Sequence, residues 1–465
     1  MVFNSLEFAV FISCFLPIFY LLRAKHSYRD LVLLIGSYIF YMASYWQYAS
    51  LILISTCVDF IVGNKIDASS SKKARKFYLV ISLVVNLSML GVFKYYNFFY
   101  ESSVIAMSYF GFSIPPLYHQ LLLPVGISFY TFQTMSYTID LYRGEIDRER
   151  SFIKFAVFVS FFPQLVAGPI VRAKDFLPQL HKKIIIVSKQ VQIGVWLIFL
   201  GLFKKIIIAD LLGYLVVDDV FDNPSGYSSV DLLVSLYAYT FQIYCDFSGY
   251  SDIAIGIAFI LGFKLPDNFN RPYIAQSPSD FWQRWHISLS SWLRDYLYIS
   301  LGGNRGKAWF VARNLVLTML LGGLWHGAAW NFVLWGLFHG LILIATRWVV
   351  VETKFNAKMV IKILANFHLV VFSWLLFRVS DMASFSDYIA GMLQFSLGSK
   401  ISLLAYLILL FAFLIHFSPK ILVHQKVRSI ILGRPIIVQA LFYAILIFLF
   451  VGASIDTANF IYFRF

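Results

Sequence analysis

The stretch LVLTMLLGGLWHGAAWNFVLWGLFHGLILIAT, residues 315–346, decides the fold class because it contains no Asp, Glu, Lys or Arg. A helix needs roughly 20 residues to cross about 30 Å of hydrocarbon, and this stretch is longer than that. His326 lies near its middle. A titratable side chain in hydrocarbon is costly, so it indicates a functional site unless it only bonds a neighbouring helix. This stretch alone fits both interpretations of His326, a functional site and a bond to a neighbouring helix.

The composition identifies a polytopic membrane protein. Of 465 residues, 60% are hydrophobic and 13% are charged, and the mean hydropathy is +0.74; soluble domains carry about 25% charged residues. The start, residues 1–22, is expected to be a retained first helix, because it has no basic segment before its apolar run. The net charge of +14 is attributed to cytoplasmic loops, and nucleic-acid binding is not expected. Cys14, Cys57 and Cys245 are far apart and indicate neither a disulfide framework nor a metal site.

Apolar runs of membrane length predict about eleven crossings in an all-α membrane protein, with some segments re-entrant or interfacial. The runs lie near residues 7–22, 31–46, 47–63, 77–97, 120–141, 191–209, 230–245, 247–263, 314–330, 331–347, 360–377, 401–417 and 436–453. The whole chain, 1–465, is expected to form one membrane domain, with N-terminal helices (1–119), a catalytic core (120–347) and C-terminal helices (348–465).

The loop charges predict the topology. Lys and Arg gather in loops 23–29, 65–76, 142–154 and 171–190, which are therefore expected in the cytoplasm, with the N-terminus outside. Loop 210–231 has five Asp and no Lys or Arg, so it is expected on the outer side.

Residues 264–313 interrupt the pattern of simple spans. They hold seven basic and three acidic residues, interleaved with aromatic ones. This pattern favours amphipathic helices in the cytoplasmic interface, with Ser279 and Asp280 as candidate N-caps of a helix from Phe281. An aromatic belt with snorkelling arginines is the alternative, although it does not require His286 in the middle of the segment.

The rise of an α-helix predicts how deep His326 lies in the bilayer. If Arg313 marks the membrane boundary, thirteen residues at about 1.5 Å each place His326 about 20 Å into the bilayer. A neutral imidazole there can act as a general base towards a hydroxyl group. Gly323 and Gly327 either pack helices closely or leave room for a substrate. His286 is expected near the mouth of a tunnel, whereas His339 is expected to be structural.

Two further polar clusters interrupt apolar sequence. Tyr244, Asp246, Ser248 and Asp252 lie between two apolar runs, which indicates either a helix break lining a cavity or a short polar turn. The Pro/Gly-bounded run at residues 162–169 is either a re-entrant hairpin or an interfacial turn.

Five motifs in order carry a family resemblance. They are residues 135–143 (MSYTIDLYR), 162–169 (FPQLVAGP), 244–252 (YCDFSGYSD), 281–305 (FWQRWH, SSWLRDYLY and LGGNR) and 321–327 (LGGLWHG). Together they resemble the membrane-bound O-acyltransferase (MBOAT) superfamily, and within it the bacterial alginate O-acetylation branch. The resemblance covers residues 120–345.

The resemblance implies a helical core around a central tunnel, with His326 as the catalytic residue and His286 in the family's second position. Acetyl-CoA is the expected donor substrate, and neither a tightly bound cofactor nor a metal is expected. The residues expected to line the tunnel or contact substrate are Trp325, Asp246, Tyr244, Ser248, Asp252, Arg294, Asp295, Tyr296 and Asn331. The residues expected to attract acyl-CoA phosphates are Arg284, Arg305 and Lys307.

The resemblance also implies a setting and partners. We expect a multi-pass protein of the bacterial cytoplasmic (inner) membrane, surrounded by lipid, which hands acetyl groups outward to an extracytoplasmic SGNH-type acetyltransferase for an exopolysaccharide synthesis machinery. Three alternatives remain: transfer of D-alanine from a carrier protein, as in the teichoic acid branch, a transporter with a proton-relay histidine, and a non-catalytic scaffold. The sequence does not name the polysaccharide.

Overall fold

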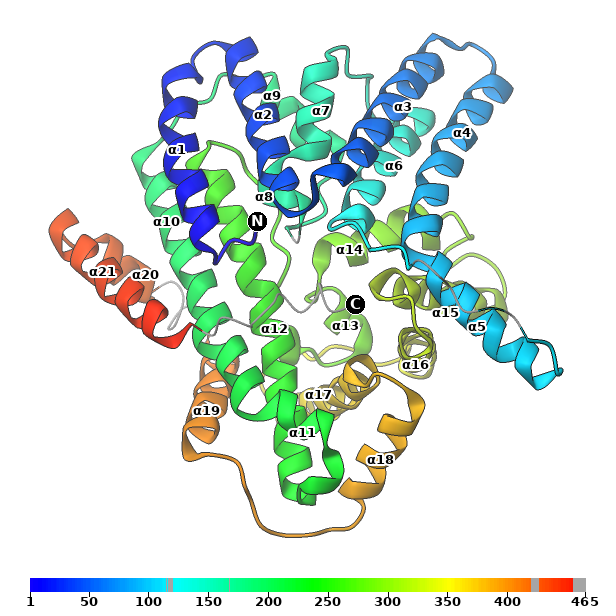
Figure 1. Cartoon of the computed structure of the whole chain (residues 1–465), viewed down its shortest axis with the longest axis vertical. Coiled ribbons are helices and arrows are strands. Elements are labelled where there is room, and N and C mark those ends of the chain that lie inside the picture. Colours follow the sequence, from blue (N-terminus) through cyan, green and yellow to red (C-terminus); the bar gives the residue numbers. More distant parts are fainter. Residues whose placement is uncertain (114, 116–119, 167, 420–425, 455–465) are drawn as a thin grey trace. The chain divides into compact units, whose positions relative to one another are not determined.

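The computed structural model describes residues 1–113, 115, 120–166, 168–419 and 426–454, and helices without strands form the described part (Figure 1). The chain is a polytopic all-helical membrane protein. Six described helices are long and apolar enough to cross a membrane, and three shorter helices are apolar. The total of about eleven crossings stays a prediction. The chain divides into two compact units, residues 1–190 with 257–266, and residues 191–256 with 267–465. The predicted division at 119 and 347 is untested.

Unit 1 is a bundle of long helices that encloses shorter ones. Its helices are α1 (Leu6–Leu22), α2 (His26–Tyr45), α3 (Ala49–Ala68), α4 (Lys72–Leu90), α5 (Tyr96–Tyr109), α6 (Ile127–Arg143), α7 (Phe152–Ser160), α8 (Phe162–Leu165) and α9 (Ala173–Leu180). Phe162 of α8 packs among Phe11, Phe15 and Phe40, with ring centroids 5.3–5.5 Å apart. This aromatic core fixes α8 inside the bundle.

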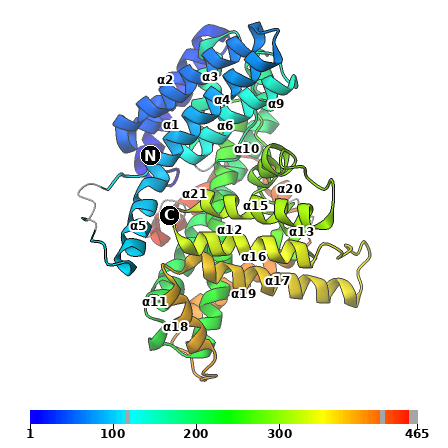
Figure 2. The same ribbon diagram turned by 90° about the vertical axis from the view of Figure 1, so that its right-hand side faces the viewer.

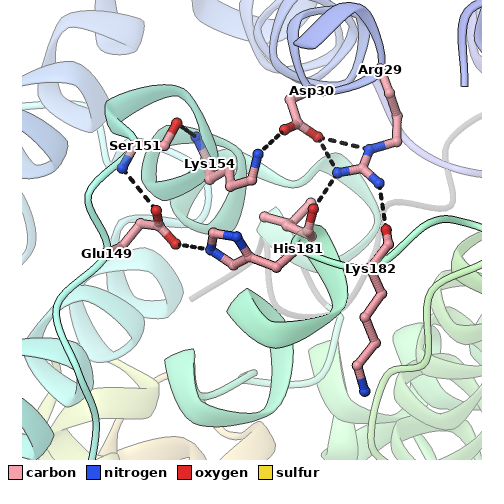
Figure 3. Close-up of polar contacts among 8 residues, drawn as sticks. Arg29, Asp30, Glu149, Ser151, Lys154, His181 and Lys182 are labelled. Atoms are coloured by element: carbon pink, nitrogen blue, oxygen red, sulfur yellow. Dashed lines mark hydrogen bonds and ion pairs between the residues drawn. The ribbon is translucent and has the colours of Figure 1, made fainter. Parts of the chain in front are cut away.

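The segment from α7 to α9 enters and leaves unit 1 at the same end. His181, just after α9, contacts Glu149, just before α7, with Nε2 and Oε2 2.6 Å apart (Figure 3). The buried guanidinium of Arg29 donates to the carbonyls of Leu180 and Lys182. The re-entrant interpretation of residues 162–169 fits this geometry, although Ala167 lies outside the described residues.

The basic loops of unit 1 meet at that end. Lys154 Nζ lies 2.7 Å from Asp30 Oδ2, and Arg148 Nε lies 2.9 Å from Asp67 Oδ2. Since these contacts and those in Figure 3 join loops 23–29, 65–76, 142–154 and 171–190, the predicted common side of the four loops agrees with the structure. Which face of the membrane that end occupies stays a prediction.

Unit 2 carries the two candidate catalytic histidines, His286 and His326. Its helices are α10 (Ser188–Leu202), α11 (Asp218–Asp222), α12 (Ser229–Ile260), α13 (Pro278–Trp282), α14 (Ile287–Trp292), α15 (Ala308–His326), α16 (Trp330–Ala345), α17 (Ala357–Arg378), α18 (Met382–Met392), α19 (Leu403–Phe417), α20 (Val427–Leu432) and α21 (Ile436–Ala453). Three π-helical stretches, at Phe203–Asp210, Gly213–Val217 and Leu293–Tyr298, extend α10 and α14. The region predicted as outer loop 210–231 is thus helical as far as Asp222, and that part of the prediction is wrong.

The predicted break at residues 244–252 is also wrong, because α12 runs unbroken through it. Lys205 Nζ lies 2.8 Å from Asp246 Oδ1, and Lys204 Nζ lies 2.6 Å from Asp252 Oδ2. These ion pairs neutralise Asp246 and Asp252 within the continuous helix. The two carboxylates can therefore be buried without a break in the α12 backbone. The predicted spans 230–245 and 247–263 are therefore one helix.

Candidate active site

His326 lies at the tip of a helical hairpin, as the last residue of α15 before the turn into α16. Figure 2 shows these two helices side by side. A Cβ on Gly323 would lie 2.2 Å from the carbonyl oxygen of Phe332, and one on Gly327 would lie 2.1 Å from the Phe332 ring. The idea that these glycines leave room for a substrate is therefore wrong, and they allow close packing.

An aromatic shell surrounds His326. Its imidazole is 4% exposed, and its ring centroid lies 5.2 Å from that of Trp325, 5.1 Å from that of Trp335 and 5.5 Å from that of Phe377. The helix is continuous from Ala308, so the predicted axial rise of about 20 Å from Arg313 agrees with the structure. Its depth in a bilayer stays a prediction.

His286 lies beside His326, with ring centroids 6.4 Å apart and no exposed surface on His286. His286 is thus buried within unit 2, and its expected position near the mouth of a tunnel stays a prediction. The expected helix from Phe281 is interrupted, because His286 has φ 42° and ψ 54° and forms the N-cap of α14. The N-cap of the preceding helix α13 is Ser277, two residues before the predicted Ser279.

Residues 264–313 were predicted to form amphipathic helices in the membrane interface. This prediction is wrong for most of their aromatic side chains, which are buried in the protein. Phe281, Trp285, Trp292 and Tyr296 are buried in unit 2, and Trp309 remains exposed. The rings pack on one another, for example Phe281 on Trp285 at 5.7 Å, so the aromatic spacing serves a core and not a membrane surface.

Asn268 holds the imidazole of His286. Its Oδ1 lies 3.2 Å from His286 Nδ1 and accepts from the backbone N–H and the hydroxyl of Ser288, while its Nδ2 donates to Ser251 Oγ. An acceptor at Nδ1 selects the tautomer with its proton there, which leaves the lone pair on Nε2. Burial lowers the pKa of His286 to about 3, so this imidazole is neutral at neutral pH.

Helix α12 lies against His286, but the contact is made by a residue that was not among the four predicted on this helix. Phe247, between Asp246 and Ser248, lies against His286 with ring centroids 4.6 Å apart. Asp246 and Asp252 instead pair with lysines of the adjoining helix. Tyr244 packs on His416 at 4.8 Å, and Ser248 is buried. The contacts of these four side chains are thus with residues other than the two histidines, and their role in lining a tunnel stays a prediction.

Trp325 is the predicted tunnel residue that the structure places directly at both histidines, 5.9 Å from His286 by ring centroids. Arg294 Nε and Asp295 Oδ1 pair with each other at 2.7 Å, and Tyr296 packs on Trp292. Asn331 Nδ2 donates to the carbonyl of Val379 at 2.9 Å, which ties the start of α16 to the end of α17.

The three residues expected to attract acyl-CoA phosphates differ in their contacts and in their exposure. Arg284 Nε donates to Asp280 Oδ1 at 2.6 Å, whereas Arg305 and Lys307 are exposed. His339 is fully buried and its Nε2 lies 3.1 Å from Ser373 Oγ, so it is hydrogen-bonded as predicted, and its structural role stays a prediction.

Sequence reasoning missed several contributors to the site. Phe247, Asn268, Trp335 and Phe377 contact or hold the histidines. Asn268 lies in the polar turn Asp-Asn-Phe-Asn, residues 267–270, whose composition indicates only a loop. The aromatic residues lie in apolar helices where nothing distinguishes them from ordinary core.

Comparison with known proteins matches residues 143–386 to the membrane-bound O-acyltransferase family. The chain is 44% identical over 388 residues to the "Probable alginate O-acetylase AlgI" of Pseudomonas aeruginosa, covering 82% of this chain and 73% of that protein. It is 36% identical over 422 residues to the peptidoglycan O-acetyltransferase of Helicobacter pylori, covering 82% and 78%. It is 30% identical over 288 residues to the teichoic acid D-alanyltransferase of Bacillus subtilis, covering 57% and 70%.

Proposed function

Because this chain belongs to the membrane-bound O-acyltransferase family and is a membrane O-acyltransferase, we propose that it transfers acetyl groups from acetyl-CoA for O-acetylation of an alginate-like exopolysaccharide. The observation that carries the proposal is the meeting of His286 and His326 in one buried aromatic site. Higher identity to the O-acetylases, at 44% and 36%, than to a D-alanyltransferase, at 30%, supports acetyl over D-alanyl transfer.

In the proposed mechanism, His326 is the general base. Its neutral imidazole takes the proton of an acceptor hydroxyl as that oxygen attacks the thioester carbonyl. The carbon–sulfur bond then breaks, and the leaving thiolate of coenzyme A takes the proton back from the imidazolium. His286, with its lone pair on Nε2, orients the reacting groups. The exposed Arg305 and Lys307 attract the coenzyme A phosphates.

The setting is part of the proposal. The basic end of unit 1 faces the cytoplasm of a bacterium, the N-terminus lies outside the inner membrane, and an SGNH-type transferase takes up the acetyl group on the outer side. These assignments rest on the loop charges and on the resemblance described above.

The donor is tested with purified protein in liposomes. Radiolabelled acetyl-CoA and a D-alanyl carrier protein are offered separately, and thioester cleavage and label on added oligosaccharide are measured. The proposal predicts cleavage and transfer from acetyl-CoA. Cleavage of only the D-alanyl thioester would show that the donor is the carrier protein and not acetyl-CoA. Solute flux without cleavage of either thioester would favour the transporter alternative.

Asn268→Ala is expected to lower kcat for acetyl transfer about 10-fold with little change in KM, because His286 loses the acceptor that fixes its tautomer. Asn268→Asp is expected to recover part of kcat but to shift the pH profile upward, since a carboxylate beside the imidazole favours its protonation. Rates measured across pH check both expectations.

Asn366→Ala is the matched control, because Asn366 is also a buried asparagine of unit 2 but donates to the carbonyl of Ala275. It should leave the pH profile unchanged. An unshifted profile for Asn268→Asp would assign Asn268 a purely structural role.

A further inference from the structure

A carboxylate of unit 1 lies in the middle of a candidate membrane span, far from the histidines in the sequence. Asp59 is ten residues after the start of α3 and has no exposed surface. Helical rise places it about 14 Å from the end of α3. An ionisable side chain at such a depth indicates a function by default.

The partners of Asp59 are neutral. Asn86 Nδ2 of α4 donates to its Oδ2 at 2.9 Å, while its Oδ1 has no hydrogen-bond partner among the described residues. Within the described chain, no Lys, Arg or His nitrogen lies within 4 Å of either oxygen. A buried carboxylate without a counter-charge is strongly unfavourable. One positive charge is therefore required to neutralise Asp59.

Oxygen atoms of three helices surround this carboxylate. Ser55 Oγ donates to Asn86 Oδ1 at 2.6 Å, and Thr134 Oγ1 of α6 lies 3.3 Å from the same oxygen. Ser82 Oγ lies 2.9 Å from Thr138 Oγ1, and the hydroxyls of Ser82 and Thr134 lie near Asp59 without forming an ordinary hydrogen bond to it. All these side chains are fully buried.

We propose that Asp59, with Ser55, Ser82, Asn86 and Thr134, forms an intramembrane site for one monovalent cation, either a proton or Na⁺. Hard cations prefer carboxylate, amide and hydroxyl oxygens, which are the groups gathered here. A single carboxylate matches a single charge, whereas a divalent cation would leave a net charge buried.

The ionisable groups on the helices packed against α3 do not replace such a cation. Tyr137 of α6 faces Asp59, and its hydroxyl accepts from the backbone N–H of Glu149. Arg75 of α4 donates to the carbonyl of Leu141. Lys154 of α7 and Arg29 of α2 both pair with Asp30, and Asp140 lies further along α6.

The test measures the thermal midpoint of detergent-solubilised protein from pH 5 to pH 9, in NaCl and in choline chloride, together with ²²Na⁺ binding. If the cation is Na⁺, the midpoint rises with NaCl alone and one ²²Na⁺ binds per chain. If it is a proton, the midpoint falls as pH rises, equally in both salts, because the folded form then has to release a proton that neutralised Asp59.

Asp59→Asn should abolish either dependence, since its amide is neutral. Asp67→Asn, on the same helix but half exposed and paired with Arg148, should preserve it. Thr134→Val keeps the carboxylate and removes one oxygen, so Na⁺ affinity should fall at least about 10-fold, while a proton site should respond little. The Thr134→Val variant therefore still tests the proposal if Asp59→Asn does not fold. Identical salt and pH dependence in wild type and Asp59→Asn, or no dependence in wild type, would overturn the proposal.

Discussion

His326→Ala is expected to lower kcat for acetyl transfer by about 10²–10⁴-fold, which is the usual contribution of a positioned general base. KM for acetyl-CoA should change little, because the proton transfer occurs in the transition state and not in the bound ground state. The imidazole lies at the end of α15, enclosed by Trp325, Trp335 and Phe377, and Ala removes it without disturbing a helix interior. Steady-state kinetics with radiolabelled donor check the result.

His339→Gln is the matched control. His339 lies in the same hairpin and is equally buried, but it contacts Ser373 and Trp335. Its loss should reduce kcat less than about 10-fold, because a structural side chain acts only through packing. Comparable losses in both variants would show that the His326 effect comes from the hairpin fold and not from base catalysis.

Lys205→Met is expected to destabilise the protein by about 3–5 kcal/mol, the usual effect of removing one partner of a buried ion pair. Lys205 Nζ lies 2.7 Å from Asp210 Oδ1 and 2.8 Å from Asp246 Oδ1, and all three side chains are at most 8% exposed. The substitution leaves two carboxylates buried beside an apolar side chain. The free energy of unfolding in mixed micelles measures the effect.

Lys204→Met provides the comparison, because Lys204 is 14% and Asp252 is 20% exposed. It should cost less than half as much, since water can solvate the remaining carboxylate. Adding Asp210→Asn and Asp246→Asn to Lys205→Met should recover most of the lost stability, because it removes both remaining buried charges. A stable Lys205→Met single variant would show that the ion cluster does not explain the continuity of α12.

The class of fold could be predicted because it depends on local sequence, whereas the end of α15 at His326 was not predicted, since the expected run continued to residue 330. Apolar length identifies the spans, and one of the two interpretations of Gly323 and Gly327, close helix packing, agrees with the structure. The continuity of α12 could not be predicted in this way. Asp246 is held by Lys205, about forty residues earlier in the chain, so residues 244–252 read in isolation look like a break.

The structure brings the two predicted histidines together, but most of the residues around them were not predicted. The segment that contains His286 was expected in the membrane interface because it is basic, yet its aromatic side chains fold inward and His286 is buried. Asn268, Phe247 and Phe377 come from three separate elements. Only the fold brings them together, so no spacing in the sequence could indicate them.

A double-mutant cycle on kcat/KM for acetyl transfer, with His286→Ala, His326→Ala and both together, tests most directly whether the two histidines form one site. Their rings lie 6.4 Å apart, and residues that act as a unit give strongly non-additive losses. The expected result is that the double variant is within about 3-fold of His326→Ala alone. A loss equal to the product of the two single losses would contradict a shared site.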